Sequence, residues 1–251
     1  MMRKMFFSVI VVFLCAQLAS ADYANPPDWQ NDPETQNFTH QSWSFDDNTN
    51  PSAPDDGGDG NPFGIASFNM VTGTWVDDLG PVYDPYDPLK YYGDRQGGWK
   101  INGPASAQEW FRIVIPNEKN LSLRKEMWFE MTFKVTDLTH LGSIVDNVQM
   151  AVYADGIEDS AHQFDYGPGP DTQEVLGVNP LDGGFWARFS TYFQYDLQPD
   201  SELVIFGGNL EASQYVILDQ IDVDTRCIPE PTTMGLLGMG VLALIRRRKN
   251  R

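Results

Sequence analysis

Two long segments of the chain alternate apolar and polar residues without interruption. In EMWFEMTFKV, residues 126–135, every second residue is apolar, from Met127 to Val135. In FWARFSTYF, residues 185–193, Phe185, Ala187, Phe189 and Phe193 fall on one side. A period of two predicts β-strands with one buried face, because successive side chains of a strand point to opposite sides of the sheet.

Shorter segments of the same kind follow one another along the chain, separated by Gly, Pro, Asn and Asp. They are residues 65–71, 98–101, 109–115, 147–154, 202–206 and 214–223. The long stretch 155–184 is interpreted as loops at one end of the fold. About eight strands with turn signals between them predict an all-β protein, an antiparallel β-sandwich of the jelly-roll kind.

The N-terminus has the pattern of a secretory signal peptide. Two basic residues, Arg3 and Lys4, precede an apolar stretch at 6–14, and an A-x-A sequence ends at Ala21. Cleavage is expected between Ala21 and Asp22. This segment predicts a short helix that is absent from the mature protein, and it predicts export.

Composition then divides the chain into four parts. Residues 1–21 are the signal peptide, and residues 22–62 form a segment rich in Pro, Asp and Gly. Because this segment also carries Trp29, Trp43 and Phe45, we expect it to be extended and to pack in places against the core. Residues 63–226 are expected to form the sandwich, and residues 227–251 a separate tail.

Charge excludes several classes of partner. Between the two terminal segments, residues 22–226 hold 34 acidic and 10 basic residues, a formal net charge of −24. Such a surface repels DNA, RNA and anionic lipid, so no nucleic-acid partner is expected. It suits an exported protein and can attract Ca²⁺.

The tail reads CIPEPTTMGLLGMGVLALIRRRKNR. Pro229, Glu230 and Pro231 precede an apolar run at 234–245, and the basic cluster Arg246, Arg247 and Arg248 follows it. The run is shorter than the roughly 20 residues that a spanning helix needs. A short hydrophobic helix is expected, with its basic end on the cytoplasmic side.

This order of elements resembles the PEP-CTERM sorting signal of Gram-negative bacteria. The resemblance implies export by the Sec translocon, removal of the leader by signal peptidase and transient retention in the inner membrane. It also implies processing near Pro229-Glu230-Pro231 by an exosortase-type transpeptidase. Delivery to the cell surface or the extracellular matrix would follow. Cys227 lies at this junction, and its fate on processing stays open.

The last strand, QYVILDQIDVDT, raises the question of a metal ion. A strict alternation places Asp219 on one face with Tyr215, Ile217, Ile221 and Val223. A carboxylate among apolar residues requires hydrogen bonds, a cation or a local bulge. The sandwich is expected to be galactose-binding-like or concanavalin-like, and this segment is similar to the closing strand of carbohydrate-binding and galactose-binding-like jelly rolls. That resemblance implies Asp219 as a ligand of a structural Ca²⁺, the one cofactor considered; hydrogen bonding to the backbone is the alternative.

Aromatic side chains on the polar strand faces suggest a sugar-binding surface. Trp128, Trp186 and Tyr192, together with Arg188, would point away from the core. Flat aromatic rings with polar groups at the rim suit carbohydrate, such as an extracellular polysaccharide. The alternative is that these rings are covered by the N-terminal segment with its own aromatic residues, or that both faces of the sheet are buried.

No motif of an enzyme is present. G-x-S-x-G, H-E-x-x-H and the phosphate-binding loop are absent, and the three histidines are scattered. The sequence therefore predicts a non-enzymatic surface protein with a structural or adhesive role. A carbohydrate-binding module is the alternative, and a polysaccharide hydrolase is a third.

Overall fold

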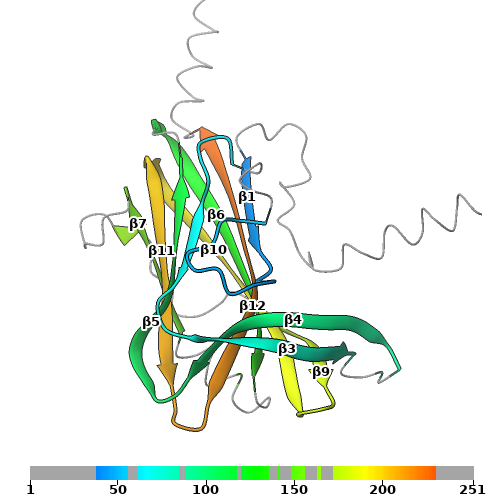
Figure 1. Ribbon diagram of the computed structural model, residues 1–251. Helices are drawn as coiled ribbons and strands as arrows, with labels where there is room; N and C mark the ends of the chain where they lie inside the picture. The colour runs from blue at the N-terminus through cyan, green and yellow to red at the C-terminus, as the bar shows by residue number, and fades with distance from the viewer. Residues whose placement is uncertain are drawn as a thin grey trace, which may run out of the picture. The chain divides into compact units, whose positions relative to one another are not determined.

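Two antiparallel β-sheets form the fold, as Figure 1 shows. The computed structural model describes residues 38–55, 61–84, 87, 89–117, 120–135, 141, 148–155, 163–164 and 172–229. All of them belong to one compact unit, residues 37–251. Within them the chain forms strands and no helix, which confirms the all-β prediction. The helices expected at the two termini lie outside the described residues.

The larger sheet has seven strands. In spatial order they are β1 (Phe38–Trp43), β12 (Tyr215–Pro229), β4 (Tyr91–Asn102), β3 (Thr74–Tyr83), β9 (Thr172–Asn179), β10 (Gly184–Gln198) and β6 (Asn120–Val135). The smaller sheet has five, in the order β2 (Ser67–Met70), β5 (Ala105–Pro116), β11 (Ser201–Leu210), β7 (Val148–Ala154) and β8 (Gln163–Phe164). The predicted sandwich is confirmed.

Phe206 of β11 joins the two sheets through a stack of aromatic rings. Its ring lies 4.9 Å from that of Phe111, 5.8 Å from that of Phe129 and 5.4 Å from that of Phe189, at interplanar angles of 19° or less. The apolar faces predicted for residues 126–135 and 185–193 are those that pack into this core. Because buried aromatic pairs add stability beyond their area, the stack fixes the distance between the sheets.

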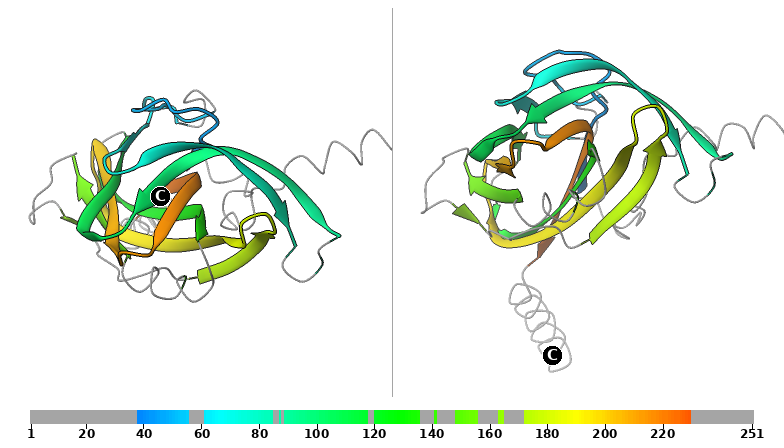
Figure 2. Two further views of the ribbon diagram at one scale, coloured as in Figure 1. Left: turned by 60° about the horizontal axis from the view of Figure 1, so that its bottom comes forward. Right: turned by 90° about the horizontal axis from the view of Figure 1, so that it is seen from below.

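The larger sheet curls until it closes on itself. β12 pairs with β4 and also with β6, so six strands run in a ring from β12 through β4, β3, β9, β10 and β6. Figure 2 shows the β3–β4 hairpin and the β9–β10 pair curving toward each other. Inside the ring lies a second apolar cluster of Leu79, Val82, Trp186 and Ile217. The strands of this ring are therefore buried on both faces along part of their length.

Asp219 is the extra residue of a β-bulge. Leu218 pairs with Phe133 and Gln220 pairs with Thr132, so the register shifts by one at Asp219. Leu218 and Ile221 consequently both face the main core. The prediction of one shared face was wrong, because Ile217 and Tyr215 belong to the second cluster. A bulge adds one residue and reverses the alternation beyond it.

Gly98 allows β4 to cross this bulge closely. A Cβ atom there would lie 2.3 Å from the carbonyl oxygen of Leu218, closer than real contacts allow. A side chain at this position would therefore separate β4 from β12.

Two strands of the ring were not predicted. β9 lies inside the stretch interpreted as loops, so that interpretation was wrong for Thr172–Asn179. β3 contains Gly80 and Pro81, and its register against β4 shifts between Asp77 and Gly80. Turn-forming residues and irregular register hide a strand from any pattern of period two.

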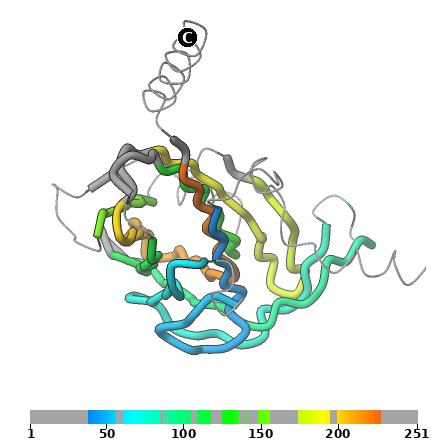
Figure 3. The backbone as a smooth tube through the Cα atoms, turned by 90° about the horizontal axis from the view of Figure 1, so that it is seen from above, coloured from blue at the N-terminus to red at the C-terminus, as the bar shows by residue number. Residues whose placement is uncertain are grey.

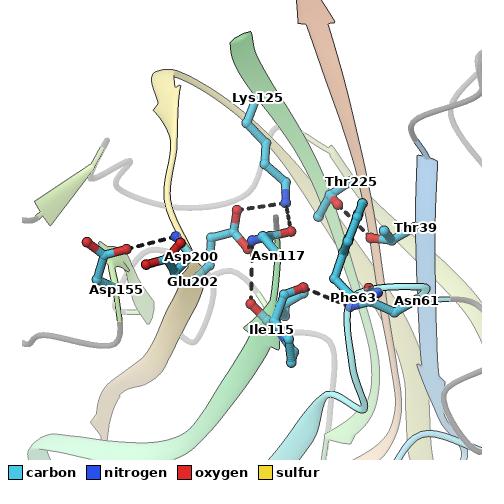
Figure 4. Close-up of polar contacts among 11 residues, drawn as sticks. Thr39, Asn61, Phe63, Ile115, Asn117, Lys125, Asp155, Asp200, Glu202 and Thr225 are labelled. Atoms are coloured by element: carbon cyan, nitrogen blue, oxygen red, sulfur yellow. Dashed lines mark hydrogen bonds and ion pairs between the residues drawn. The ribbon is translucent and has the colours of Figure 1, made fainter. Parts of the chain in front are cut away.

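An ion pair is buried between the sheets at one end of the sandwich. Lys125 of β6 lies on the core face, and its Nζ is 2.8 Å from Oε1 of Glu202 on β11. Asn117 accepts from Lys125 and donates to Glu202, completing the network in Figure 4. The side-chain exposures are 1% and 0%. Neither charge is accessible to water, so each is compensated by the opposite charge of its partner.

Lys125→Met should lower the free energy of unfolding by about 3–5 kcal/mol, because Glu202 is left buried without its counter-charge. Urea denaturation at pH 7 measures the change. Lys90→Met is the matched control, since Lys90 forms a 3.3 Å ion pair with Asp84 but its side chain is 58% exposed. That variant should leave stability nearly unchanged. Equal effects of the two substitutions would contradict the structural role of the buried pair.

Candidate functional site

The side of β12, β6 and β10 that points away from the phenylalanine core carries mostly polar side chains. We call it the polar face, and with its neighbours on β1 it consists of His40, Ser42, Trp128, Glu130, Thr132, Arg188, Ser190, Tyr192, Gln220, Asp222 and Asp224. The register aligns them in rows across the strands. Figure 3 shows β1 lying alongside β12 at one edge. The rows bring together residues that are far apart in the sequence.

Of the four predicted sugar-binding residues, two form a surface. Tyr192 is directly opposite Trp128 across β10 and β6, so the two rings occupy one side of the sheet. Tyr192 is 40% exposed and Trp128 is partly buried. This pair lies at the end of the polar face away from the β3–β4 hairpin.

The other two are buried, as the alternative interpretation foresaw. Trp186 is 1% exposed and packs with Leu79 and Val82 in the second apolar cluster. The cations of Arg95 and Lys134 each lie 5.7 Å from its ring centroid. A ring enclosed in this way contributes to the fold and is inaccessible to a polymer.

Arg188 holds two carboxylates on the polar face. Its Nη2 is 2.7 Å from Oε2 of Glu174, and its Nη1 is 3.4 Å from Oε1 of Glu130. Arg188 is 5% exposed. Its guanidinium group therefore bridges Glu174 and Glu130 through two of its nitrogen atoms.

Two buried carboxyl groups face each other in the middle of the polar face. Glu130 and Asp222 are directly opposite across β6 and β12, and they are 4% and 3% exposed. Burial raises the pKa of Glu130 to about 7, although Arg188 opposes the shift. Burial likewise raises the pKa of Asp222 to about 7, against a hydrogen bond from Ser42. The pair therefore holds a proton near neutral pH, as closely placed buried carboxyls do.

Asp224 lies two residues beyond Asp222 on β12, opposite His40 of β1. Its Oδ1 lies 2.8 Å from Nδ1 of His40. Burial raises the pKa of Asp224, while the hydrogen bond with His40 lowers it. Gln220 Nε2 donates to Oδ2 of Asp222 at 2.9 Å. This network was not predicted: Asp222 and Asp224 alternate visibly with apolar residues, but their position opposite Glu130 depends on the pairing of distant strands.

The predicted calcium ligand has a different neighbour. Oδ2 of Asp219 is 3.1 Å from Nη1 of Arg95, which reaches across from β4. Among the residues that the structure describes, no three His, Cys, Asp or Glu side chains are grouped so as to hold a metal ion. A guanidinium group therefore supplies the positive charge that this carboxylate requires, and Ca²⁺ at Asp219 stays a prediction.

The sorting residues lie at the end of the described chain. Pro229 is the last residue of β12 and pairs with Leu123 of β6. Glu230, Pro231 and the basic residues Arg246, Arg247 and Arg248 lie outside the described residues, as do Ala21 and Asp22. In the part of the chain that the structure describes, no helix is long and apolar enough to span a membrane. Cys227 has a partly buried position in β12.

The opposed carboxyls should make stability depend on pH. Their folded-state pKa of about 7 lies above the value near 4 of an unfolded carboxyl, so the folded state binds more protons between these limits. The free energy of unfolding should therefore fall, by on the order of 2 kcal/mol, as the pH rises from 5 to 8.

Urea denaturation across this range measures the slope. Glu130→Gln should flatten it, whereas Glu211→Gln, at an exposed position before β12, should not. Stability that rises with pH over this window would contradict the assignment.

Comparison with known proteins adds information on the tail. A search of curated sequences finds no significant match. Solved structures similar to the chain include a carbohydrate-binding module that recognises mannan, at 12% identity, with 81% of this chain and 96% of that one covered and a TM-score of 0.31. The K1 cleaved adhesin domain of Lys-gingipain from Porphyromonas gingivalis W83 is 14% identical, with coverages of 74% and 97% and a TM-score of 0.29. These values are too low to assign a ligand.

Residues 228–249 match the PEP-CTERM protein-sorting motif. The resemblance noted in the sequence is thereby confirmed. The chain carries a PEP-CTERM sorting signal, which indicates sorting by an exosortase toward the cell surface.

Proposed function

We propose that this protein is a non-catalytic β-sandwich with a structural or adhesive role at the surface, or in the extracellular matrix, of a Gram-negative bacterium. The observation that carries the proposal is the continuity between the fold and the sorting motif. The motif begins at residue 228, while β12 continues to Pro229. Ile228 and Pro229 still pair with Arg124 and Leu123 of β6. The sorted cargo is therefore the compact sandwich itself.

The order of events follows from the two ends of the chain. The Sec translocon exports the protein, and signal peptidase cleaves between Ala21 and Asp22. The apolar run 234–245 then holds the protein transiently in the inner membrane, with Arg246 to Arg248 on the cytoplasmic side. An exosortase acts near Glu230, next to the last paired residue of β12.

The absence of catalysis is supported by the burial of the opposed carboxyls. A glycosidase requires two carboxyl groups on either side of a substrate. Glu130 and Asp222 are opposite each other, but they are 4% and 3% exposed. Side chains buried to this extent are out of reach of a polymer. Their ion and hydrogen-bond partners indicate a structural network.

A second function is supported by the accessible aromatic pair. Trp128 and Tyr192 are neighbours on adjacent strands, and Gln194, two residues beyond Tyr192, donates to Glu126 at 3.2 Å. A flat pair of rings with polar groups beside it suits the apolar face of a sugar. We propose that this patch binds extracellular polysaccharide.

Deletion of residues 230–251 should release the protein from the surface, because it removes the sorting signal while leaving all of β12. Immunoblotting of surface, periplasmic and medium fractions measures the distribution. The substitution Glu230→Ala combined with Pro231→Ala should act in the same direction, and Thr232→Ala with Thr233→Ala is the neighbouring control. Unchanged surface attachment after the deletion would contradict exosortase sorting.

Trp128→Ala should weaken binding to the host's own polysaccharide by about tenfold or more, the loss typical of a central aromatic contact. Tyr192→Ala should weaken it in the same direction. Polysaccharide pull-down and affinity electrophoresis measure the effect, with thermal unfolding as the check on folding. Tyr91→Ala is the matched control, because Tyr91 is 50% exposed on β4.

Trp186→Ala does not serve as a binding test, since Trp186 is buried and its loss should destabilise the closed ring of six strands. Equal binding by the Trp128 and Tyr91 variants would count against the patch.

A further inference from the structure

A small pocket lies outside the polar face, beside the loop that follows β1. Trp43 and Phe45 contribute to it with residues of the 44–55 loop, and its volume is about 190 Å³. The lining residues are Trp43, Phe45, Asp46, Asp47, Thr49, Ser52, Ala53 and Asp55. None of the predicted sugar-binding residues is among them.

The loop that forms the pocket is anchored at several points. The side chain of Asn50 pairs with both backbone groups of Met70, at 2.8 Å each. Ser52 forms two backbone hydrogen bonds with Phe68, both of 2.9 Å. The backbone N–H of Ser44 donates to Oδ2 of Asp55 at 2.7 Å. The pocket is therefore largely preformed, which reduces the entropy lost when a ligand binds.

Two polar side chains that line the pocket are not satisfied by the protein. Trp43 is 1% exposed, yet its indole Nε1 has no hydrogen-bond partner among the described residues. The hydroxyl of Ser52 is also buried and without a partner there. Buried polar groups nearly always have partners, so a ligand with hydrogen-bonding atoms is the expected complement. The indole N–H requires an acceptor, such as a hydroxyl oxygen.

The charge of the pocket is negative. Asp46, Asp47 and Asp55 line it, and among the described residues no Lys or Arg does. The hydroxyl and backbone N–H of Thr49 hydrogen-bond to Asp47 and lower its pKa, so this carboxylate is ionised at neutral pH. A cationic group on the ligand would complement these side chains.

The spacing of the acids favours an organic cation over a metal ion. Calcium requires several oxygens converging at 2.3–2.6 Å, and the described residues contain no such group of three acidic side chains. A cavity of about 150 Å³ holds a benzene ring. The 190 Å³ pocket is therefore of the size of one six-membered ring with small substituents.

From this combination we infer that the pocket binds an amino sugar, a six-membered ring that carries a protonated primary amine beside hydroxyl groups. The ammonium group faces the carboxylates of Asp46 and Asp47. Ring or hydroxyl oxygens accept from Trp43 Nε1 and exchange hydrogen bonds with Ser52. The site goes beyond the proposed polysaccharide patch, from which it differs in residues and in charge. It takes either a free amino sugar or a de-acetylated residue of a polymer.

Isothermal titration calorimetry of the full-length chain with glucosamine, N-acetylglucosamine and glucose tests this site. Glucosamine should bind at least about tenfold more tightly than either neutral sugar, because only it carries the ammonium group. Chitosan and chitin oligosaccharides form the polymer arm. Tighter binding of chitosan oligomers than of glucosamine identifies a polymer as the source, and equal binding identifies the free sugar.

The variants separate the pocket from the polar face. Asp46→Asn with Asp47→Asn should weaken glucosamine binding by about tenfold, and Ser52→Ala should weaken it less. Asp78→Asn, an exposed acid of β3, and Trp128→Ala should both leave it unchanged. Thermal unfolding checks that each variant is folded.

Three results would overturn the inference. They are no binding up to about 20 mM glucosamine, equal affinity for glucosamine and glucose, and loss of binding in Trp128→Ala but not in the double aspartate variant. The last result would place the glucosamine site on the polar face. It would not contradict the proposal that Trp128 and Tyr192 bind polysaccharide.

Discussion

β6 is hydrogen-bonded to β10 on one side and to β12 on the other, and this double pairing organises the molecule. On its core face, Phe129 stacks with Phe206 of β11 in the opposite sheet. Lys125 forms an ion pair with Glu202, which is also on β11. On its other face, Glu130 meets Asp222, while Lys134 lies over Trp186. Because successive side chains of a strand point to opposite sides, the alternating sequence of β6 places core residues between the sheets and polar residues on the polar face.

The closure of the larger sheet decides which part of the polar face can meet a ligand. The β3–β4 hairpin covers the end that carries Trp186, and Gly98 lets β4 approach the Asp219 bulge closely. Trp128 and Tyr192 lie at the other end. Between them, Arg188 contacts Glu130 and His40 contacts Asp224, so these buried carboxyl groups have polar partners, as the high cost of an isolated buried charge requires. The face is therefore structural in its middle and accessible at one end.

The two proposed binding regions differ in their chemical character. The aromatic pair offers an apolar platform, whereas the pocket by the 44–55 loop offers carboxylates, an indole N–H and a hydroxyl. Both belong to the same compact unit, whose last strand continues into the sorting motif. The proposed binding regions and the start of the sorting motif thus belong to one compact unit.

Local patterns in the sequence determined the all-β class, the core faces of β6 and β10, and the sorting motif at 228–249. These features depend on neighbours two residues apart or on a contiguous signal, and both can be read along the chain. Tertiary structure alone decided the bulge at Asp219, the strand in Thr172–Asn179, the burial of Trp186 and Arg188, and the opposition of Glu130 and Asp222. Each of these depends on the register and closure of strands distant in sequence, where a shift of one residue moves every side chain to the other face.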